Sequence, residues 1–155
     1  MSKGFEDYFS QLQADMVSIC LEYVENRAEK IYIYCSCESN AISSDFFYCI
    51  NNKIVRKHKL NEVISDENQE KYDVSGDRQT AVLEIINGDI EKIYKLCKEY
   101  KREIPTEMKL IYDVEKNSLK AEYRYDLVYS NDPVKSARHV AMEWFEKVKL
   151  ENEKN

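Results

Sequence analysis

The fold is decided by residues 108–125, which read MKLIYDVEKNSLKAEYRY. On both sides of the polar segment 115–118, apolar or aromatic side chains alternate with mostly charged ones. A period of two is typical of a strand that is covered on one face, and a short polar segment between two such runs is typical of a turn. The stretch therefore predicts a β-hairpin within an antiparallel sheet.

Three further strands are predicted upstream of this hairpin. Residues 30–37 alternate between Ile or Cys and Tyr or Ser, with the β-branched and aromatic enrichment of a strand. The polar residues 38–44 predict a loop, and 45–50 predict a second strand. Asn51–Asn52 forms a two-residue turn in this prediction, because Asn tolerates positive φ, and a third strand follows over 53–60.

Three segments carry apolar residues at gaps of three and four, which is the spacing of an amphipathic helix. They predict helices over 5–27, over 78–102 and after Asp132–Pro133, where the Asp caps the helix and the Pro occupies its first turn. Asp77 is the expected cap of the second helix, and Gly88 marks a position where it could bend or break.

The element order is then α-β-β-β-α-β-β-α. Strands joined by short turns favour an α+β fold, and we expect an antiparallel sheet of about five strands with helices packed on one face. The length of 155 residues and the absence of a linker predict one domain over 1–155, with a frayed tail at 151–155.

The composition narrows the classes of partner. The chain holds 23 Lys and Arg against 29 Asp and Glu, so its formal charge is −6 and direct binding to nucleic acid is not expected. No apolar run approaches the roughly 20 residues that span a bilayer, so no membrane partner is expected either. Residues 1–7 lack the apolar core of an export signal, which favours the cytoplasm.

The cysteines and histidines give little support for catalysis or metal binding. In a cytoplasmic chain, an odd number of cysteines favours reduced thiols that pack as small apolar residues: Cys20, Cys35, Cys37, Cys49 and Cys97. Cys35 and Cys37 share a strand face with two isoleucines, so core packing is a simpler interpretation than a zinc or redox site. His58 and His139 lie in segments that do not favour a nucleophilic pair, and the glycines are isolated. We expect no catalytic site, no metal and no cofactor.

The long polar connection 61–77 is the candidate partner-binding segment. Its candidate residues are mostly acidic: Asp66, Glu67, Glu70, Tyr72, Asp73 and Asp77. One interpretation is a merely solvated loop, and the other is a recognition surface for a basic protein, since complementary charge steers association. The tyrosines of the predicted sheet divide similarly between core residues and interface anchors: Tyr32, Tyr34, Tyr48, Tyr123 and Tyr125.

The layout as a whole resembles the YezG-like antitoxin or immunity proteins of polymorphic toxin systems. The resemblance follows an opening amphipathic helix and continues through 29–34, 46–48, 93–100, 123–126 and 143–147. It implies a cytoplasmic protein without catalytic residues, which binds a cognate toxin domain, often a nuclease, and blocks it.

Two other functions remain open. Type III secretion chaperones are also small and acidic, have the same element order, and look like homodimers that hold an effector segment in extended form. A homodimer is therefore compatible with the sequence. The third alternative is a thiol- or metal-dependent enzyme that uses Cys35 and Cys37.

The first testable prediction concerns the thiols. Titration of the unfolded protein, purified without oxidant, should count all five cysteines as reduced, because they are expected to pack in the core. Stoichiometric zinc in elemental analysis of the folded protein would contradict this prediction.

Overall fold

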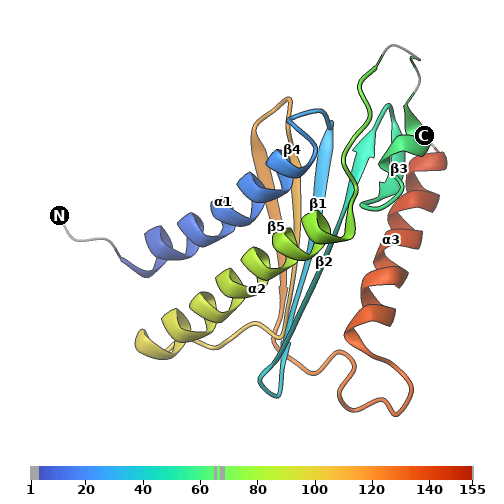
Figure 1. Ribbon diagram of the computed structural model, residues 1–155. Coiled ribbons are helices and arrows are strands. Elements are labelled where there is room, and N and C mark those ends of the chain that lie inside the picture. The colour runs from blue at the N-terminus through green and yellow to red at the C-terminus, as the bar shows by residue number, and fades with distance from the viewer. Residues whose placement is uncertain (1–3, 65, 67–68, 155) are drawn as a thin grey trace.

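The computed structural model describes residues 4–64, 66 and 69–154 (Figure 1). Its elements, in chain order, are helix α1 (Phe5–Tyr23), strands β1 (Lys30–Glu38), β2 (Ala41–Ile50) and β3 (Lys53–Arg56), a 3-10 turn (Leu60–Val63), helix α2 (Gly76–Glu99), strands β4 (Glu107–Asp113) and β5 (Ser118–Arg124), and helix α3 (Ala137–Glu153). The α+β class and the order α-β-β-β-α-β-β-α are confirmed.

The five strands form one antiparallel sheet in the order β3-β2-β1-β4-β5, so β1 is the central strand. Ile33 of β1 faces Phe46 on β2 and Leu110 on β4. The hairpin of residues 108–125 is present as β4 and β5, paired from Glu107 with Arg124 to Asp113 with Ser118. The alternation of the sequence therefore predicted the pairing of these strands correctly.

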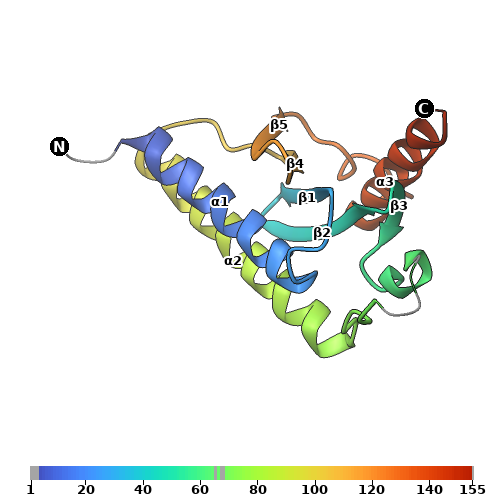
Figure 2. The ribbon, with the colours of Figure 1, turned by 90° about the horizontal axis from the view of Figure 1, so that it is seen from above.

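Helices cover both faces of the sheet, so the expectation that they pack on one face is wrong. Figure 2 shows α1 and α2 on one side of the sheet and α3 on the other. Ile31 and Ile33 pack against the first pair of helices, whereas Tyr32 and Tyr34 pack under α3. The reason is visible in β1 itself: both of its alternating sets are apolar enough to be buried, as in a strand covered on two sides.

The face under α3 is built from packed aromatic rings. Tyr32 and Phe47 stack at 4.6 Å between ring centroids, and Trp144 meets Phe47 edge-on at 5.1 Å. The buried Glu38 holds the segment that precedes α3. Its carboxylate accepts hydrogen bonds from the N–H groups of Val128 (2.8 Å) and Ser130 (3.0 Å).

The loop expected at 38–44 is instead a two-residue turn. Ser39 and Asn40 both adopt positive φ, which lets β1 pass directly into β2. Asn51 and Asn52 form the second such turn, as predicted. The third strand stops at Arg56 rather than residue 60, because a turn brings the chain back into the core at Leu60.

The helix boundaries also differ from the expected ones. Ser75, not Asp77, caps α2 by accepting the Arg78 N–H (3.4 Å), and α2 passes through Gly88 as one continuous helix. The carboxylate of Asp132 accepts N–H groups within its own turn, so α3 begins later, after Ser136.

The ends of two other helices differ as well. The first helix ends at Tyr23 instead of residue 27, since Glu25 and Asn26 adopt positive φ. Helix α3 continues to Glu153, so the tail expected to fray from residue 151 is helical there. Asn155 lies outside the described residues.

All five cysteines are buried and free, and Cys35 and Cys37 share the α1–α2 face with Ile31 and Ile33, as predicted. Burial raises the pKa of the Cys35 thiol far above its ordinary value. This thiol is therefore protonated at neutral pH and contributes to the core as a small apolar side chain.

The second testable prediction concerns Asp89, a carboxyl of α2 that is only 3% exposed and lies beside Asp15 of α1. Burial, reinforced by Asp15, raises the pKa of Asp89 to about 7. The folded state thus binds a proton that the unfolded chain releases at lower pH, so stability contributed by this group is lost as pH rises from about 4 through 7.

Replacing Asp89→Asn removes the charge and should raise the free energy of unfolding at pH 8 by about 1–3 kcal/mol, while flattening its decline between pH 4 and 7. Urea unfolding at several pH values measures this. Glu84→Gln, which changes an exposed carboxylate of the same helix, is the control and should follow the wild type. An Asp89→Asn variant with the wild-type pH dependence would contradict the assignment.

Candidate partner-binding surface

Of the predicted connection 61–77, residues 61–63 belong to the 3-10 turn and residues 76–77 to α2. The connection itself is therefore 64–75, of which Ile64, Asp66 and residues 69–75 are described. Its central residue, Tyr72, is 4% exposed and belongs to the core under α1 and α2. The Tyr72 hydroxyl donates to the carbonyl oxygen of Arg27 (2.9 Å). The ring of Tyr72 therefore anchors the connection to the fold and is buried in the free protein, and its assignment to partner binding stays a prediction.

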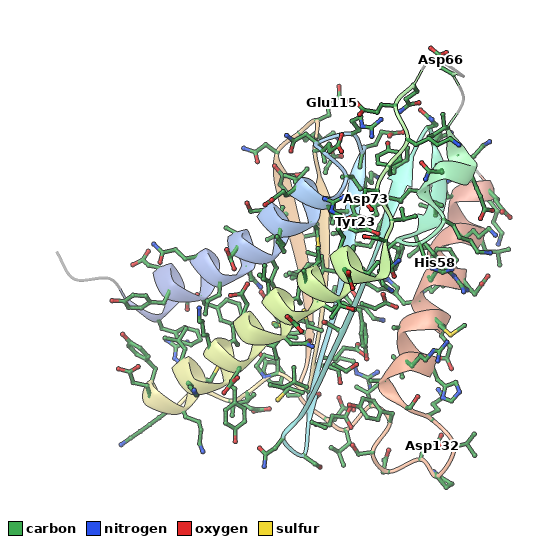
Figure 3. The ribbon with its side chains drawn as sticks, in the orientation of Figure 1. Tyr23, His58, Asp66, Asp73, Glu115 and Asp132 are labelled. Atoms are coloured by element: carbon green, nitrogen blue, oxygen red, sulfur yellow. The ribbon has the colours of Figure 1, made fainter. Side chains whose placement is uncertain are left out.

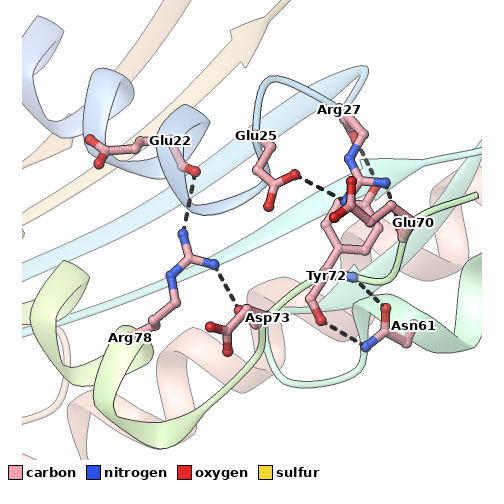
Figure 4. A network of polar contacts seen from close by, with 8 residues as sticks. All are labelled: Glu22, Glu25, Arg27, Asn61, Glu70, Tyr72, Asp73 and Arg78. Carbon is pink, nitrogen blue, oxygen red and sulfur yellow. Dashed lines mark hydrogen bonds and ion pairs between the residues drawn. The ribbon is translucent and has the colours of Figure 1, made fainter.

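Asn61 holds the main chain of Tyr72 itself, and Arg27 holds the main chain at Glu70 (Figure 4). The Asn61 side chain accepts from Tyr72 N–H (2.8 Å) and donates to Tyr72 O (3.0 Å). The Arg27 guanidinium lies 4.0 Å over the Tyr72 ring, and its Nη1 donates to the carbonyl oxygen of Glu70 (2.6 Å). Side chains from outside residues 64–75 thus hold the connection through its main-chain groups.

Arg78 repeats this arrangement at the start of α2. Its Nη1 donates to the carbonyl oxygen of Asp73 (2.9 Å) and its Nη2 to that of Glu22 (3.4 Å), which joins the connection to α1 (Figure 4). The N–H of Ser75 donates to the Asp73 carboxylate (3.1 Å), and this hydrogen bond lowers the pKa of Asp73. Asp73 is therefore ionised at neutral pH.

The acidic candidates lie on the outside of this frame. Asp66, Glu70, Asp73 and Asp77 are exposed, whereas Glu67 lies outside the described residues. Within the described part of the chain, no ion pair joins Glu70, Asp73 or Asp77 to a basic side chain. Figure 3 shows Asp66 at the tip of the connection, at the same end of the molecule as Glu115 in the β4–β5 turn. The arrangement can present fixed negative charge to a partner.

The sheet tyrosines separate into two groups. Tyr32, Tyr34 and Tyr48 are buried, whereas Tyr123 and Tyr125 are 37% and 48% exposed. The exposed pair lines a hollow of about 350 Å³ together with the first turns of α1, and this hollow is called the aromatic hollow below. Its other ring-bearing walls are Phe5 and Phe9.

The histidines lie apart from the cysteines. His58 lines a second hollow, of about 390 Å³, between α3 and the strands β2 and β3, next to Lys57 and Arg138. Burial and the cations of its neighbours lower the pKa of His58, and Lys57 pairs with Asp45 at 2.6 Å. His139 hydrogen-bonds to Ser136 at the start of α3 (3.2 Å between its Nδ1 and the Ser136 N). Neither histidine is hydrogen-bonded to a cysteine in the described part of the chain.

Metal-binding groups and membrane-spanning helices are both absent from the described residues. No group of three or more His, Cys, Asp or Glu side chains there is placed to hold a metal ion. None of the helices combines the length and the apolar character needed to cross a membrane. Neither the protein-family models nor the curated proteins compared with the chain gave a match.

The acidic candidates could be selected from their density along the chain, but the residues that hold them could not. Arg27, Asn61 and Arg78 form no pattern with the connection in the sequence, and Arg27 and Arg78 bond to main-chain oxygens. Every residue has a main-chain carbonyl oxygen, so the sequence does not indicate which residue an arginine will bond to in this way. The one available signal was Tyr72, a large aromatic residue in an otherwise polar stretch. It indicated either a residue buried in the core or an anchor for a partner.

The third testable prediction is that Tyr72→Ala releases the connection. Loss of the buried ring and of its hydrogen bond to Arg27 should lower the free energy of unfolding by about 3 kcal/mol. It should also speed amide hydrogen exchange over 69–75 in the native state. Lys71→Ala, at the exposed neighbouring position, is the control and should change stability by less than about 0.5 kcal/mol. Equal exchange in the two variants would show that Tyr72 is not the anchor.

Proposed function

We propose that this protein is an inhibitor that binds a basic protein domain, in the manner of an immunity protein or antitoxin that blocks a cognate toxin. The observation that carries the proposal is the acidic connection: the carboxylates of Asp66, Glu70 and Asp73 are exposed. Its backbone is held by Arg27, Tyr72 and Arg78. A mere solvated loop has no need of such anchoring. The resemblance to YezG-like proteins supports the same class of function.

Fixing the connection before binding has an energetic consequence. A flexible segment loses conformational freedom when it binds, and that loss subtracts from affinity. Here the main-chain bonds from Arg27 and Arg78 have already ordered residues 69–75 in the free protein. The carboxylates of Glu70, Asp73 and Asp77 can therefore engage a basic surface with little further ordering.

The charge also affects the rate of encounter. A net charge of −6 and an exposed acidic segment attract a positively charged domain over distances of about a Debye length, 8–10 Å at physiological salt. A toxin surface that normally holds nucleic acid has this positive charge, and an acidic protein placed on it excludes the substrate. Blocking by occlusion requires no catalytic group of the inhibitor.

The state of the thiols supports a binding role over a thiol enzyme. The thiolate is the reactive form of cysteine, and burial raises the pKa values of the Cys20, Cys35 and Cys37 thiols. These side chains are suited to packing in the core. We place the inhibitor in the cytoplasm, where it would protect the cell that makes the toxin.

A secretion chaperone is the second candidate function, and the aromatic hollow beside strand β5 is the feature that favours it. Such a protein would hold an extended segment of an effector rather than a folded domain. The two functions differ in whether the partner must be folded to bind.

The fourth testable prediction concerns the product of a toxin-like gene adjacent to the gene of this protein. We expect this protein to protect cells that express the adjacent product and to bind its folded domain with a rapid, salt-dependent association. The triple variant Asp66→Lys, Glu70→Lys and Asp77→Lys should slow association at least tenfold at low salt, because it removes the steering charge. Stopped-flow fluorescence or biosensor kinetics measures the rate.

The control is a second triple variant, Glu84→Lys, Glu99→Lys and Glu103→Lys, which makes the same change in net charge at exposed positions outside the connection. It should retain most of the wild-type rate. Equal slowing in both variants would mean that total charge, and not the connection, directs binding. Failure to protect cells, together with binding of only an unfolded effector segment, would favour the chaperone.

A further inference from the structure

Strand β5 is an edge of the sheet that nothing covers in the described chain. The other edge, β3, is only four residues long and is flanked by the 3-10 turn, whose Val63 carbonyl accepts a hydrogen bond from the side chain of Asn51 (2.7 Å). By contrast β5 has seven residues, and all but Ala121 are exposed. Long exposed edges are templates for pairing with another strand, and many proteins blunt them with charge, proline or a covering segment.

The backbone groups that β5 offers follow from the pairing of the sheet. The two-residue turn at Ser39–Asn40 closes on Glu38 and Ala41, a pair that exchanges both hydrogen bonds. The direction of the backbone N–H and C=O groups alternates along a strand, so those of the odd-numbered residues of β1 point toward β4. The hydrogen bond from Cys37 N–H to Thr106 O (2.9 Å) is an example. Each further strand continues the alternation.

At the end of this series, the even-numbered residues of β5 bond to β4. Leu119, Ala121 and Tyr123 therefore direct their N–H and C=O groups away from the sheet. Their side chains lie on the face of α1 and α2, and those of Lys120, Glu122 and Arg124 lie on the opposite face.

Two antiparallel copies of β5 have complementary side chains when they pair symmetrically about Ala121. An antiparallel second copy then places Lys120 opposite Glu122 of that copy, and Glu122 opposite its Lys120. Leu119 lies opposite Tyr123 in the same way. Opposite charges and aliphatic–aromatic pairs across antiparallel strands are both stabilising. In the described chain neither Lys120 nor Glu122 forms an ion pair, so both charges are available.

Moving the twofold axis by one residue along β5 removes this complementarity. Symmetric pairing about Lys120 sets two lysines opposite each other, and pairing about Glu122 sets two glutamates opposite each other. Like charges directly opposite are destabilising. In each of these three arrangements the outward N–H and C=O groups of the odd-numbered residues lie opposite outward groups of the copy, so hydrogen bonds can form in all of them. The side-chain charges are what select the pairing about Ala121.

The aromatic hollow adds an apolar contact to this pairing. Tyr123 packs edge-on against Phe9 at 5.8 Å between ring centroids, and its hydroxyl accepts a hydrogen bond from Gln13 Nε2 (2.7 Å). It therefore forms a fixed wall of the hollow beside the end of β5. Leu119 of a second copy, which is 37% exposed in the free chain, comes to lie against this wall.

We propose that two copies of this chain associate through β5, as antiparallel neighbours about Ala121, so that their two sheets become one continuous sheet. The association is isologous, since the same strand serves both copies under a twofold axis. It is independent of the proposed function, because the acidic connection takes no part in it.

The fifth testable prediction is the mass of the protein in solution. Sedimentation equilibrium should give twice the chain mass of 18.4 kDa at high concentration, with dissociation on dilution. Lys120→Glu sets two pairs of glutamates opposite each other, and Glu122→Lys sets two pairs of lysines. Each variant should weaken self-association at least tenfold. Ala121→Pro should do the same, since it removes only an outward N–H and leaves the bonds to β4 intact.

Two experiments that restore opposite charges across the interface act as controls. The double variant Lys120→Glu with Glu122→Lys restores opposite charges and should dimerise as the wild type does. An equimolar mixture of the two single variants should form a heterodimer, although each alone is monomeric. Circular dichroism checks that every variant is folded. A monomeric wild type at all soluble concentrations, or a dimer that tolerates Lys120→Glu and Ala121→Pro, would overturn the proposal.

Discussion

The burial of strand β1 on both faces is the constraint on which the rest of the structure depends. Ile31 and Ile33 require one apolar cover, and Tyr32 and Tyr34 require another. A single layer of helices cannot satisfy both, so α1 and α2 cover one face and α3 covers the other (Figure 2). Each face then has its own core, one mainly aliphatic and one built from aromatic rings that pack around Trp144.

This arrangement also positions the acidic connection. With α1 and α2 side by side on one face, the chain must travel from the end of β3 to the start of α2 across that end of the molecule (Figure 1). Tyr72 inserts into the core on the way, and Arg27, from the turn between α1 and β1, caps its ring. The exposed carboxylates are therefore presented from a segment that is part of the core, and this distinguishes them from the charges of an ordinary solvated loop.

Local patterns in the sequence predicted most of the fold, because the spacing of apolar residues along a strand or helix indicates its buried face. The β4–β5 hairpin and the Asn51–Asn52 turn are examples. Spacing does not reveal which element covers a face, so the position of α3 was missed even though Tyr32 and Tyr34 indicated a second buried face. At the candidate site, Asp66, Glu70, Asp73 and Asp77 are exposed as expected, but Tyr72 is not. Its partner Arg27 lies 45 residues away along the chain, and only the folded structure brings the two together.

We propose that the connection 64–75, together with Asp77 in the first turn of α2, is the surface that meets a folded basic partner. The most direct measurement is native-state hydrogen exchange, followed by mass spectrometry, on the protein alone and in complex with the toxin-like domain that we expect an adjacent gene to encode. We expect added protection over residues 69–77 and over the adjoining turn that carries Arg27, with little change along α3. A complex in which these segments exchange as fast as in the free protein, while β3 or α3 becomes protected, would contradict the claim.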